Sequence, residues 1–126
     1  MIERLRAGTT FGYLAYVDGV PAGWANASMR GDYAMFRQGD DDDATTIGLS
    51  CFAIAPPYRG HGLSRQLLER VVADAESRQA TAVEAYPVND PALGSQFRGP
   101  RALYDATGFA EVAVRARDTV VRRPTS

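Results

Sequence analysis

Residues 59–64, of sequence RGHGLS, form a short glycine-containing turn whose composition suits a phosphate-binding site. An apolar, strand-like segment precedes the turn and ends at two prolines, and an amphipathic segment of helical spacing follows it. The backbone N–H groups at the start of a helix lack intrahelical partners, and the helix dipole adds partial positive charge there. Gly60 and Gly62 permit positive φ angles and carry no side chain that would shield these donors. We therefore expect the turn to bind a phosphate or pyrophosphate group.

The spacing of the glycines distinguishes this turn from two common phosphate loops. A Walker loop requires a Lys directly after its last glycine, and a dinucleotide-binding loop requires a third glycine; neither is present. The turn matches the pattern R-x-x-G-x-[G/A], with the small residue Ser64 in the last position. In this it resembles the acyl-CoA pyrophosphate loop of the GNAT N-acetyltransferase superfamily. The alternative is an ordinary glycine turn that precedes a helix.

A second motif, residues 102–109 of sequence ALYDATGF, resembles the late helix of the same superfamily, which has the form A-L-Y-x-x-x-G-F. An ordinary short helix that ends at Gly108 and is packed by Leu103 and Phe109 is the alternative. The two motifs occur in the order typical of the superfamily, with a predicted strand between them. The chain therefore resembles GNAT acetyltransferases over roughly residues 10–122. Residues 51–60, of sequence CFAIAPPYRG, and residues 83–88, of sequence VEAYPV, are also similar to a bacterial subgroup of the superfamily whose acceptors are unassigned.

The apolar pattern predicts an α/β fold, and the resemblance implies that its sheet is mixed and GNAT-like. We expect an N-terminal antiparallel hairpin, a β-α-β acyl-CoA-binding unit, a short helix and a C-terminal strand. Asp18-Gly19 is a strong hairpin signal, and the ligand turn falls at the carboxyl end of the first strand of the β-α-β unit. The predicted strands span residues 11–17, 20–29, 46–55, 82–88 and 111–121, and the expected loops and tail span 30–45, 89–101 and 122–126.

The start of the chain departs from the resemblance. The superfamily opens with a strand and one or two helices ahead of the hairpin, whereas about ten residues precede Phe11 here, enough for a turn or two of helix. We therefore expect this front segment to be missing and strand 11–17 to lie at the edge of the sheet. An unprotected apolar edge pairs readily with another chain, so a two-fold homodimer is expected. The alternative is that residues 1–10 fold back over this edge.

The resemblance implies transfer of an acetyl group from acetyl-CoA to the amine of a small-molecule acceptor, which the sequence does not identify. The pyrophosphate of the cofactor would lie on the backbone of the turn, and its pantetheine arm would pair with the backbone of the preceding strand. No metal is implied. The residues implied in cofactor binding are Phe52, Ala53, Ile54, Arg59, Gly60, His61, Gly62, Leu63 and Ser64.

Two residues are candidates for proton transfer. Tyr104 falls on the tyrosine position of the family, where its phenol would protonate the departing thiolate; the alternative is an aromatic residue that only packs. Glu84 stands between apolar residues in a predicted inner strand, so it is either the general base or the partner of an arginine. The Glu that several relatives carry in the strand before the turn is not present. His61 is expected to face solvent or the phosphates rather than to act as a base.

Composition and charge limit the remaining possibilities. The 126 residues, 45% of them hydrophobic, predict a single domain over residues 1–126. A net charge of −1 argues against nucleic acid as a partner, and the lack of a signal peptide or a long apolar run predicts a cytoplasmic protein without a membrane partner. Cys51, the only cysteine, is expected to be buried and inert. The acidic run 40–43 is expected to be solvated, with attraction of a cationic amine as the alternative.

Three functions are consistent with these features. The first is an acetyl-CoA-dependent N-acetyltransferase that acts on a small amine. The second is a non-catalytic, regulatory acyl-CoA-binding domain, which the missing front segment and the missing Glu would explain. The third is a phosphate-binding α/β protein outside the superfamily. Titration with acetyl-CoA separates the third from the others, and thioester consumption with a panel of amines separates the first two.

Overall fold

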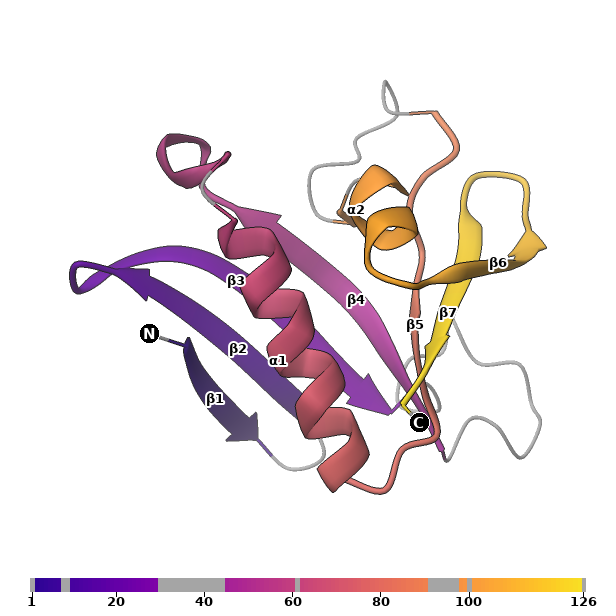
Figure 1. The fold of residues 1–126 in the computed structure, drawn as a ribbon, viewed down its shortest axis with the longest axis horizontal. Coiled ribbons are helices and arrows are strands. Elements are labelled where there is room, and N and C mark those ends of the chain that lie inside the picture. Colours follow the sequence, from indigo (N-terminus) through magenta and orange to yellow (C-terminus); the bar gives the residue numbers. More distant parts are fainter. Residues whose placement is uncertain are drawn as a thin grey trace.

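A mixed sheet with strand order β1-β2-β3-β4-β5-β7-β6 forms the centre of the computed structural model (Figure 1). The structure describes residues 2–7, 10–29, 45–60, 62–90, 98–99 and 101–125. This architecture confirms the expected α/β fold with a mixed sheet. The described strands are β1 (Ile2–Ala7), β2 (Thr10–Val17), β3 (Val20–Met29), β4 (Thr46–Ile54), β5 (Ala82–Ala85), β6 (Ala110–Val114) and β7 (Thr119–Pro124). The helices are α1 (Leu63–Ser77) and α2 (Arg101–Ala106), with a short 3₁₀ turn at Pro56–Tyr58.

The hairpin of β2 and β3 forms as the sequence predicts. Val17 pairs with Val20, and the two residues between them adopt the left-handed conformation, with φ of 52° at Asp18 and 79° at Gly19. Positive φ at both central residues matches the right-handed twist of the two strands, and it is the reason that Asp-Gly is favoured there. Trp24 on β3 lies between Leu14 on β2 and Ala53 on β4 in this register.

The prediction that strand 11–17 lies at the edge of the sheet is wrong, and the alternative, in which the segment before it folds back over this edge, is correct. Residues 2–7 form the strand β1, which pairs antiparallel with β2 from Ile2 opposite Ala15 to Ala7 opposite Thr10. A strand rises more than 3 Å per residue, so a few residues that could form only a turn of helix suffice to cover the neighbouring strand. β2 is therefore not an edge strand. The homodimer was predicted because this strand was expected to expose its edge, and that reason no longer applies.

The β-α-β unit is confirmed, and its two strands diverge. β4 and β5 are parallel and pair from Thr46 opposite Ala82 to Leu49 opposite Ala85. β5 ends at that point, whereas β4 continues to Ile54. The chain after β5 moves away from β4, and α2 lies in the opening between them (Figure 1).

Helix α1 covers one face of β2, β3 and β4 (Figure 1). Its apolar residues recur at helical spacing and are buried against strand residues such as Tyr13, Ala25 and Phe52. The buried residues of the helix are Leu63, Leu67, Leu68, Val71, Val72 and Ala75. This packing fixes the start of α1 next to the end of β4. Among the described residues, no helix combines the length and the apolar composition needed to cross a membrane.

The C-terminal part differs from the prediction of one strand and a tail. Segment 110–124 forms two antiparallel strands, β6 and β7, and β7 lies between β5 and β6. Arg115 and Asp118 close the turn, with the Arg115 N–H donating to the Asp118 carbonyl oxygen at 2.8 Å and an ion pair between their side chains. The alternating pattern of residues continues through this turn, so periodicity alone does not reveal it.

A buried ion pair joins β5 to β7. Glu84 is fully buried and lies opposite Arg122 in the antiparallel register. The Arg122 Nε–H donates to Glu84 Oε2 at 2.8 Å, and a second guanidinium nitrogen contacts the same oxygen. The hydroxyl of Tyr86 donates to the other oxygen, Oε1, at 3.3 Å. These donors provide the hydrogen-bond partners that a carboxylate buried inside a sheet requires.

Removal of the arginine should therefore destabilise the fold. Arg122→Met leaves the Glu84 carboxylate buried without its countercharge, and we expect the free energy of unfolding to fall by about 2–3 kcal/mol, below the full cost of a buried pair because Arg122 is partly exposed. Urea unfolding measures this loss. Arg101→Met is the control, since Arg101 pairs with Asp105 and Glu111 at the surface, where ion pairs contribute little. Equal stability of the two variants would contradict a structural role for the buried pair.

Candidate functional site

The turn between β4 and α1 has the open glycine backbone that the sequence predicts. Gly60 has φ of 83° and Gly62 has φ of 79°, and a Cβ atom at either position would meet no described neighbour within 4 Å. The N–H of Gln66 donates to the Gly62 carbonyl oxygen at 3.2 Å, so the N–H groups of residues 63–65 precede the first intrahelical bond. The backbone donors at the start of α1 are thus accessible to an anion from the side of the glycines.

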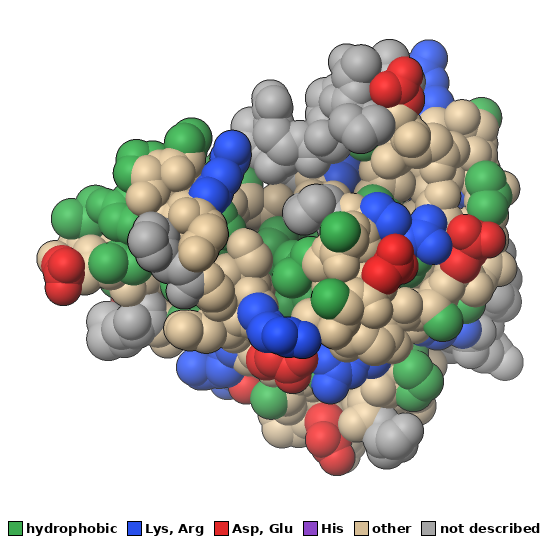
Figure 2. All heavy atoms as spheres, turned by 45° about the horizontal axis from the view of Figure 1, so that its top comes forward, with side chains coloured by type: hydrophobic (Ala, Val, Ile, Leu, Met, Phe, Trp, Pro, Cys, Tyr) green, Lys and Arg blue, Asp and Glu red, His purple; other side chains and the backbone are tan. Residues whose placement is uncertain are grey.

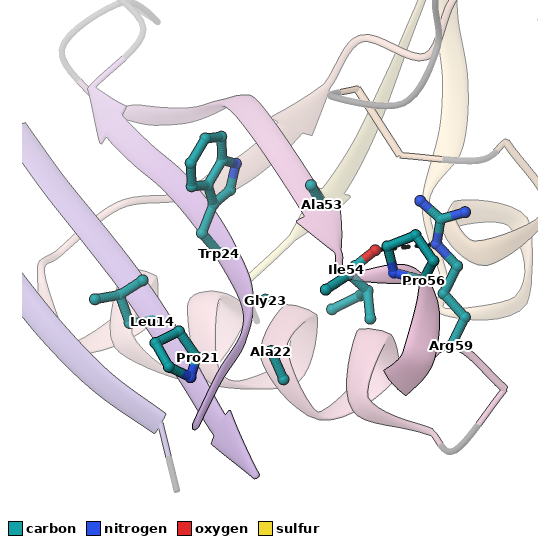
Figure 3. Close-up of a pocket in the computed structure, with 10 residues that line it drawn as sticks. Leu14, Pro21, Ala22, Gly23, Trp24, Ala53, Ile54, Pro56 and Arg59 are labelled. Atoms are coloured by element: carbon teal, nitrogen blue, oxygen red, sulfur yellow. Dashed lines mark hydrogen bonds between the residues drawn. The ribbon is translucent and has the colours of Figure 1, made fainter. Parts of the chain in front are cut away.

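The side chain of Arg59 helps to fix the turn. Its Nε–H donates to the carbonyl oxygen of Ile54 at 3.0 Å, which ties the turn to the last residue of β4 (Figure 3). Gly60 and Gly62 are exposed, Ser64 is half-buried, and Leu63 is buried against the core. His61, also predicted to bind the cofactor, lies outside the described residues.

A bulge in β4 lies where the strand separates from β5. Asn26 pairs with Cys51 and Ala27 pairs with Leu49, so Ser50 is the extra residue of β4 in this register. Bulges redirect backbone groups and are frequent beside active sites. A serine at this position does not indicate a bulge, so Ser50 was not predicted to belong to the site.

The end of β4, predicted to pair with the pantetheine arm, already has a neighbour. Phe52 pairs with Arg98 in an isolated parallel bridge, on the side of β4 that β5 has left. Phe52 and Ile54 point their side chains into the core beneath α1, whereas Ala53 is half-buried and faces the other side of the sheet. Arg98 was not predicted to belong to the site, because it lies in a segment that sequence patterns describe only as a loop.

Tyr104 on α2 is completely buried beside this bridge. Its hydroxyl donates to the carbonyl oxygen of Arg98 at 2.7 Å, and its ring makes edge contacts with Phe52 and Phe109. Burial raises the pKa of this phenol well above its usual range, with the charge of Arg98 as a smaller opposing influence. Tyr104 therefore retains its proton and, in this structure, already donates it to a hydrogen bond.

Glu84 was expected to be either the general base or the partner of an arginine, and in the structure it pairs with Arg122. Its carboxylate accepts from Arg122 and from the Tyr86 hydroxyl, as described above. Tyr104 and Glu84 lie on different elements, with no hydrogen bond between them among those described. Catalysis by Glu84 stays a prediction that this arrangement does not favour.

Two adjoining hollows lie on the face of the sheet opposite α1. Both include Leu14 and Trp24; one, of about 390 Å³, extends to Pro56 and Arg59, and the other, of about 320 Å³, reaches Cys51. Trp24 and Ala53 point away from α1, and Trp24 is 47% exposed (Figure 3). Cys51 is only partly buried, so the expectation of a fully buried thiol is wrong.

A further hollow is visible from the end of the sheet at which β4 and β5 diverge. Figure 2 shows it between the part of the molecule that carries the β4–α1 turn, on the left, and the part that carries α2, on the right. Hydrophobic side chains are exposed within it (Figure 2). Within the described residues, no group of three or more His, Cys, Asp or Glu side chains is arranged to hold a metal ion. The site thus offers backbone donors and apolar walls.

Structures of several acetyltransferases share this fold. The protein is similar to an acetyltransferase from Thermus thermophilus, with 23% identity and a TM-score of 0.69 over 93% of this chain and 65% of that chain. It is similar to PaiA N-acetyltransferase from Thermoplasma acidophilum, solved in complex with coenzyme A, with 13% identity and a TM-score of 0.71 over 92% of this chain and 61% of that chain. For IAA acetyltransferase from Bacillus cereus, the identity is 15% and the TM-score 0.70 over 98% of both chains.

These identities are low, and they establish the fold alone; no curated protein sequence matches the chain. The chain spans less than two thirds of the Thermus and Thermoplasma proteins. A family model gives the stronger assignment, since the one for the acetyltransferase (GNAT) family matches residues 1–109, most of the sequence. The glycine turn, the diverging strands and this match agree: the chain belongs to the GNAT family of acetyltransferases.

Proposed function

We propose that this protein transfers an acetyl group from acetyl-CoA to the amine of a small-molecule acceptor. The observation that carries the proposal is the position of the open turn, whose backbone donors lie at the start of α1 and at the end of the diverging strand β4. A pyrophosphate on the turn leaves the pantetheine arm free to follow β4 into the opening. The coenzyme A complex of the Thermoplasma relative supports this choice of cofactor. A cytoplasmic location belongs to the same proposal.

The proposed cofactor site consists of the backbone of residues 59–64 for the pyrophosphate and the backbone of residues 52–54 for the arm. Small residues in the turn let the phosphates reach the N–H groups directly, as the open space at Gly60 and Gly62 permits. An extended arm that pairs with β4 would satisfy backbone groups that β5 does not reach.

The chemical step needs two proton transfers. The amine nitrogen attacks the carbonyl carbon of the thioester, the C–S bond breaks, and the electron pair leaves with sulfur. The nitrogen must lose a proton, and the thiolate must gain one. Tyr104 is the proposed donor to sulfur, because it is protonated and lies beside the end of β4. Glu84 could accept the proton of the amine only if its ion pair with Arg122 opened. Transfer of this proton to solvent or to another group of the substrate is simpler, because it leaves the ion pair intact.

One observation favours the alternative, a regulatory domain that binds acyl-CoA without turnover. Both candidate catalytic groups are engaged elsewhere in this structure, Tyr104 with Arg98 and Glu84 with Arg122. Release of free thiol from acetyl-CoA, measured with a panel of amines, separates the two functions. Binding without amine-dependent thiol release would leave the regulatory function in place of the enzyme.

The cofactor site is tested at Gly62. In Gly62→Val the new side chain would occupy the space through which phosphates reach the N–H groups, and we expect the affinity for CoA to fall by about tenfold or more, since several hydrogen bonds to a charged group would be lost. Isothermal titration with CoA gives the dissociation constant.

Gly19→Val is the matched control for Gly62→Val. Gly19 also has φ of 79° and open space around it, but it lies in the β2–β3 turn. Both variants carry the same backbone strain, so only a blocked phosphate site should separate their affinities. Undiminished CoA binding by folded Gly62→Val would exclude the turn as the pyrophosphate site.

The proposed role of Tyr104 is tested by removal of its hydroxyl. Tyr104→Phe should lower kcat by about 10²–10⁴-fold, the usual contribution of a general acid, without weakening the binding of acetyl-CoA. Tyr13→Phe is the control, because Tyr13 is also buried and its hydroxyl donates to Asp74 on the far part of α1. A loss of less than a few-fold in Tyr104→Phe would reduce Tyr104 to a packing residue.

A further inference from the structure

The segment Arg98-Gly99 takes the place beside β4 that β5 vacates. β5 accompanies β4 in parallel only as far as Leu49, and Arg98 then pairs with Phe52, again in parallel. The backbone of Arg98 thus extends the sheet by a single position on the inner side of the opening. The proposed path of the pantetheine arm runs along the same side of the same residues.

The side chain of Arg98 anchors the segment to the wall formed by β5 and β7. One guanidinium nitrogen donates to the Tyr86 carbonyl oxygen at 3.1 Å and to Asp118 Oδ2 at 3.3 Å. Asp118 is buried in part and is itself held by Arg115, at 2.6 and 2.7 Å. Arg98 therefore bridges the two walls, with its backbone on β4 and its side chain on the turn that closes β6 and β7.

The opposite side of the segment is fitted to Tyr104. Gly99 is buried with φ of 81°, and a Cβ atom there would overlap the Tyr104 hydroxyl oxygen and lie 3.0 Å from Cζ. Any side chain at residue 99 would therefore collide with the ring. Gly99 lets the backbone approach closely enough for the Arg98 carbonyl to accept the Tyr104 hydroxyl at 2.7 Å. The segment satisfies β4 and the phenol at the same time.

We propose that Arg98-Gly99 is a built-in competitor for the pantetheine arm of the cofactor, and that binding of the arm displaces it from β4 and frees the Tyr104 hydroxyl. This inference rests on the proposed function. The backbone of Arg98 occupies both groups that the arm and its thiol would use, the edge of β4 at Phe52 and the Tyr104 hydroxyl. The protein therefore exists in a closed form that binds only the nucleotide end of CoA and an open form that binds the whole cofactor.

Because only the open form binds the whole cofactor, the apparent affinity for CoA is the affinity of the open form multiplied by the fraction of the protein that is open. Removal of the Arg98 side chain removes one anchor of the segment and shifts the equilibrium toward the open form. The side chain contributes a partly buried ion pair and an added hydrogen bond, and their loss should change the ratio of open to closed protein by about 3–10-fold. Weakening the segment should therefore strengthen the binding of CoA. If Arg98 only supported the binding site, its removal would weaken the binding of CoA instead.

The test compares CoA with adenosine 3′,5′-bisphosphate, which lacks the arm. In Arg98→Ala we expect the dissociation constant of CoA to fall by about 3–10-fold, while that of the bisphosphate does not fall. Loss of a positive charge would weaken the binding of an anion, so charge cannot account for tighter binding. Arg101→Ala, which removes an arginine from exposed pairs with Asp105 and Glu111, is the control and should leave the ratio of the two dissociation constants unchanged.

Gly99→Ala should also destabilise the closed form, because its methyl group pushes the segment away from Tyr104, whereas Arg98→Ala releases it from Asp118. This variant too should bind CoA more tightly than the wild type, and it tests the competition with the pantetheine arm if Arg98→Ala does not fold. Unchanged or weaker CoA binding in the folded variants would contradict the proposal that Arg98-Gly99 competes with the arm. An equal increase in affinity for the bisphosphate would contradict it as well. If neither the wild type nor any variant binds CoA or the bisphosphate, the proposed function itself fails and the competitor fails with it.

Discussion

The backbone of β4 beyond Leu49 carries hydrogen-bonding groups on the side that faces β5, and β5 does not reach them. Buried backbone groups without partners are costly, so the chain must supply another partner or leave room for a ligand. The arrangement around the opening follows from this constraint. The bulge at Ser50, the glycine turn after β4, helix α2 and the Arg98 bridge all lie where the two strands separate.

The wall opposite β4 is held together by charged groups inside the structure. Glu84 is balanced by Arg122, and Asp118 is balanced by Arg115 and Arg98. Burial alone would raise the pKa of Asp118, but its hydrogen bonds and ion pairs with the two arginines outweigh burial and hold the pKa below its ordinary value. The folded-state pKa of this carboxyl is lowered, so its contribution to stability is present above the ordinary pKa of about 4 and is lost as pH falls through the lowered value.

The parts of the fold that the sequence predicts are those fixed by local chemistry. Asp18-Gly19 specifies a two-residue turn, and the apolar spacing after Gly62 specifies α1. The parts that it misses depend on contacts between distant segments. β1 is identified by its pairing with β2, and the break between β6 and β7 depends on an ion pair within a continuous alternating pattern. Arg98 belongs to the site only because the strands separate there, which no property of the loop residues reveals.

A buried tyrosine that already donates a hydrogen bond can still serve as an acid, because the two possible acceptors differ in charge. The Arg98 carbonyl is neutral, whereas a thiolate leaving acetyl-CoA is anionic. Hydrogen bonds to charged groups contribute about 1.5–3 kcal/mol to stability, against about 0.5–1.5 kcal/mol for neutral pairs. The exchange of one acceptor for the other is therefore favourable once negative charge develops on sulfur. The same low-dielectric surroundings that raise the pKa of Tyr104 also strengthen its bond to the developing thiolate.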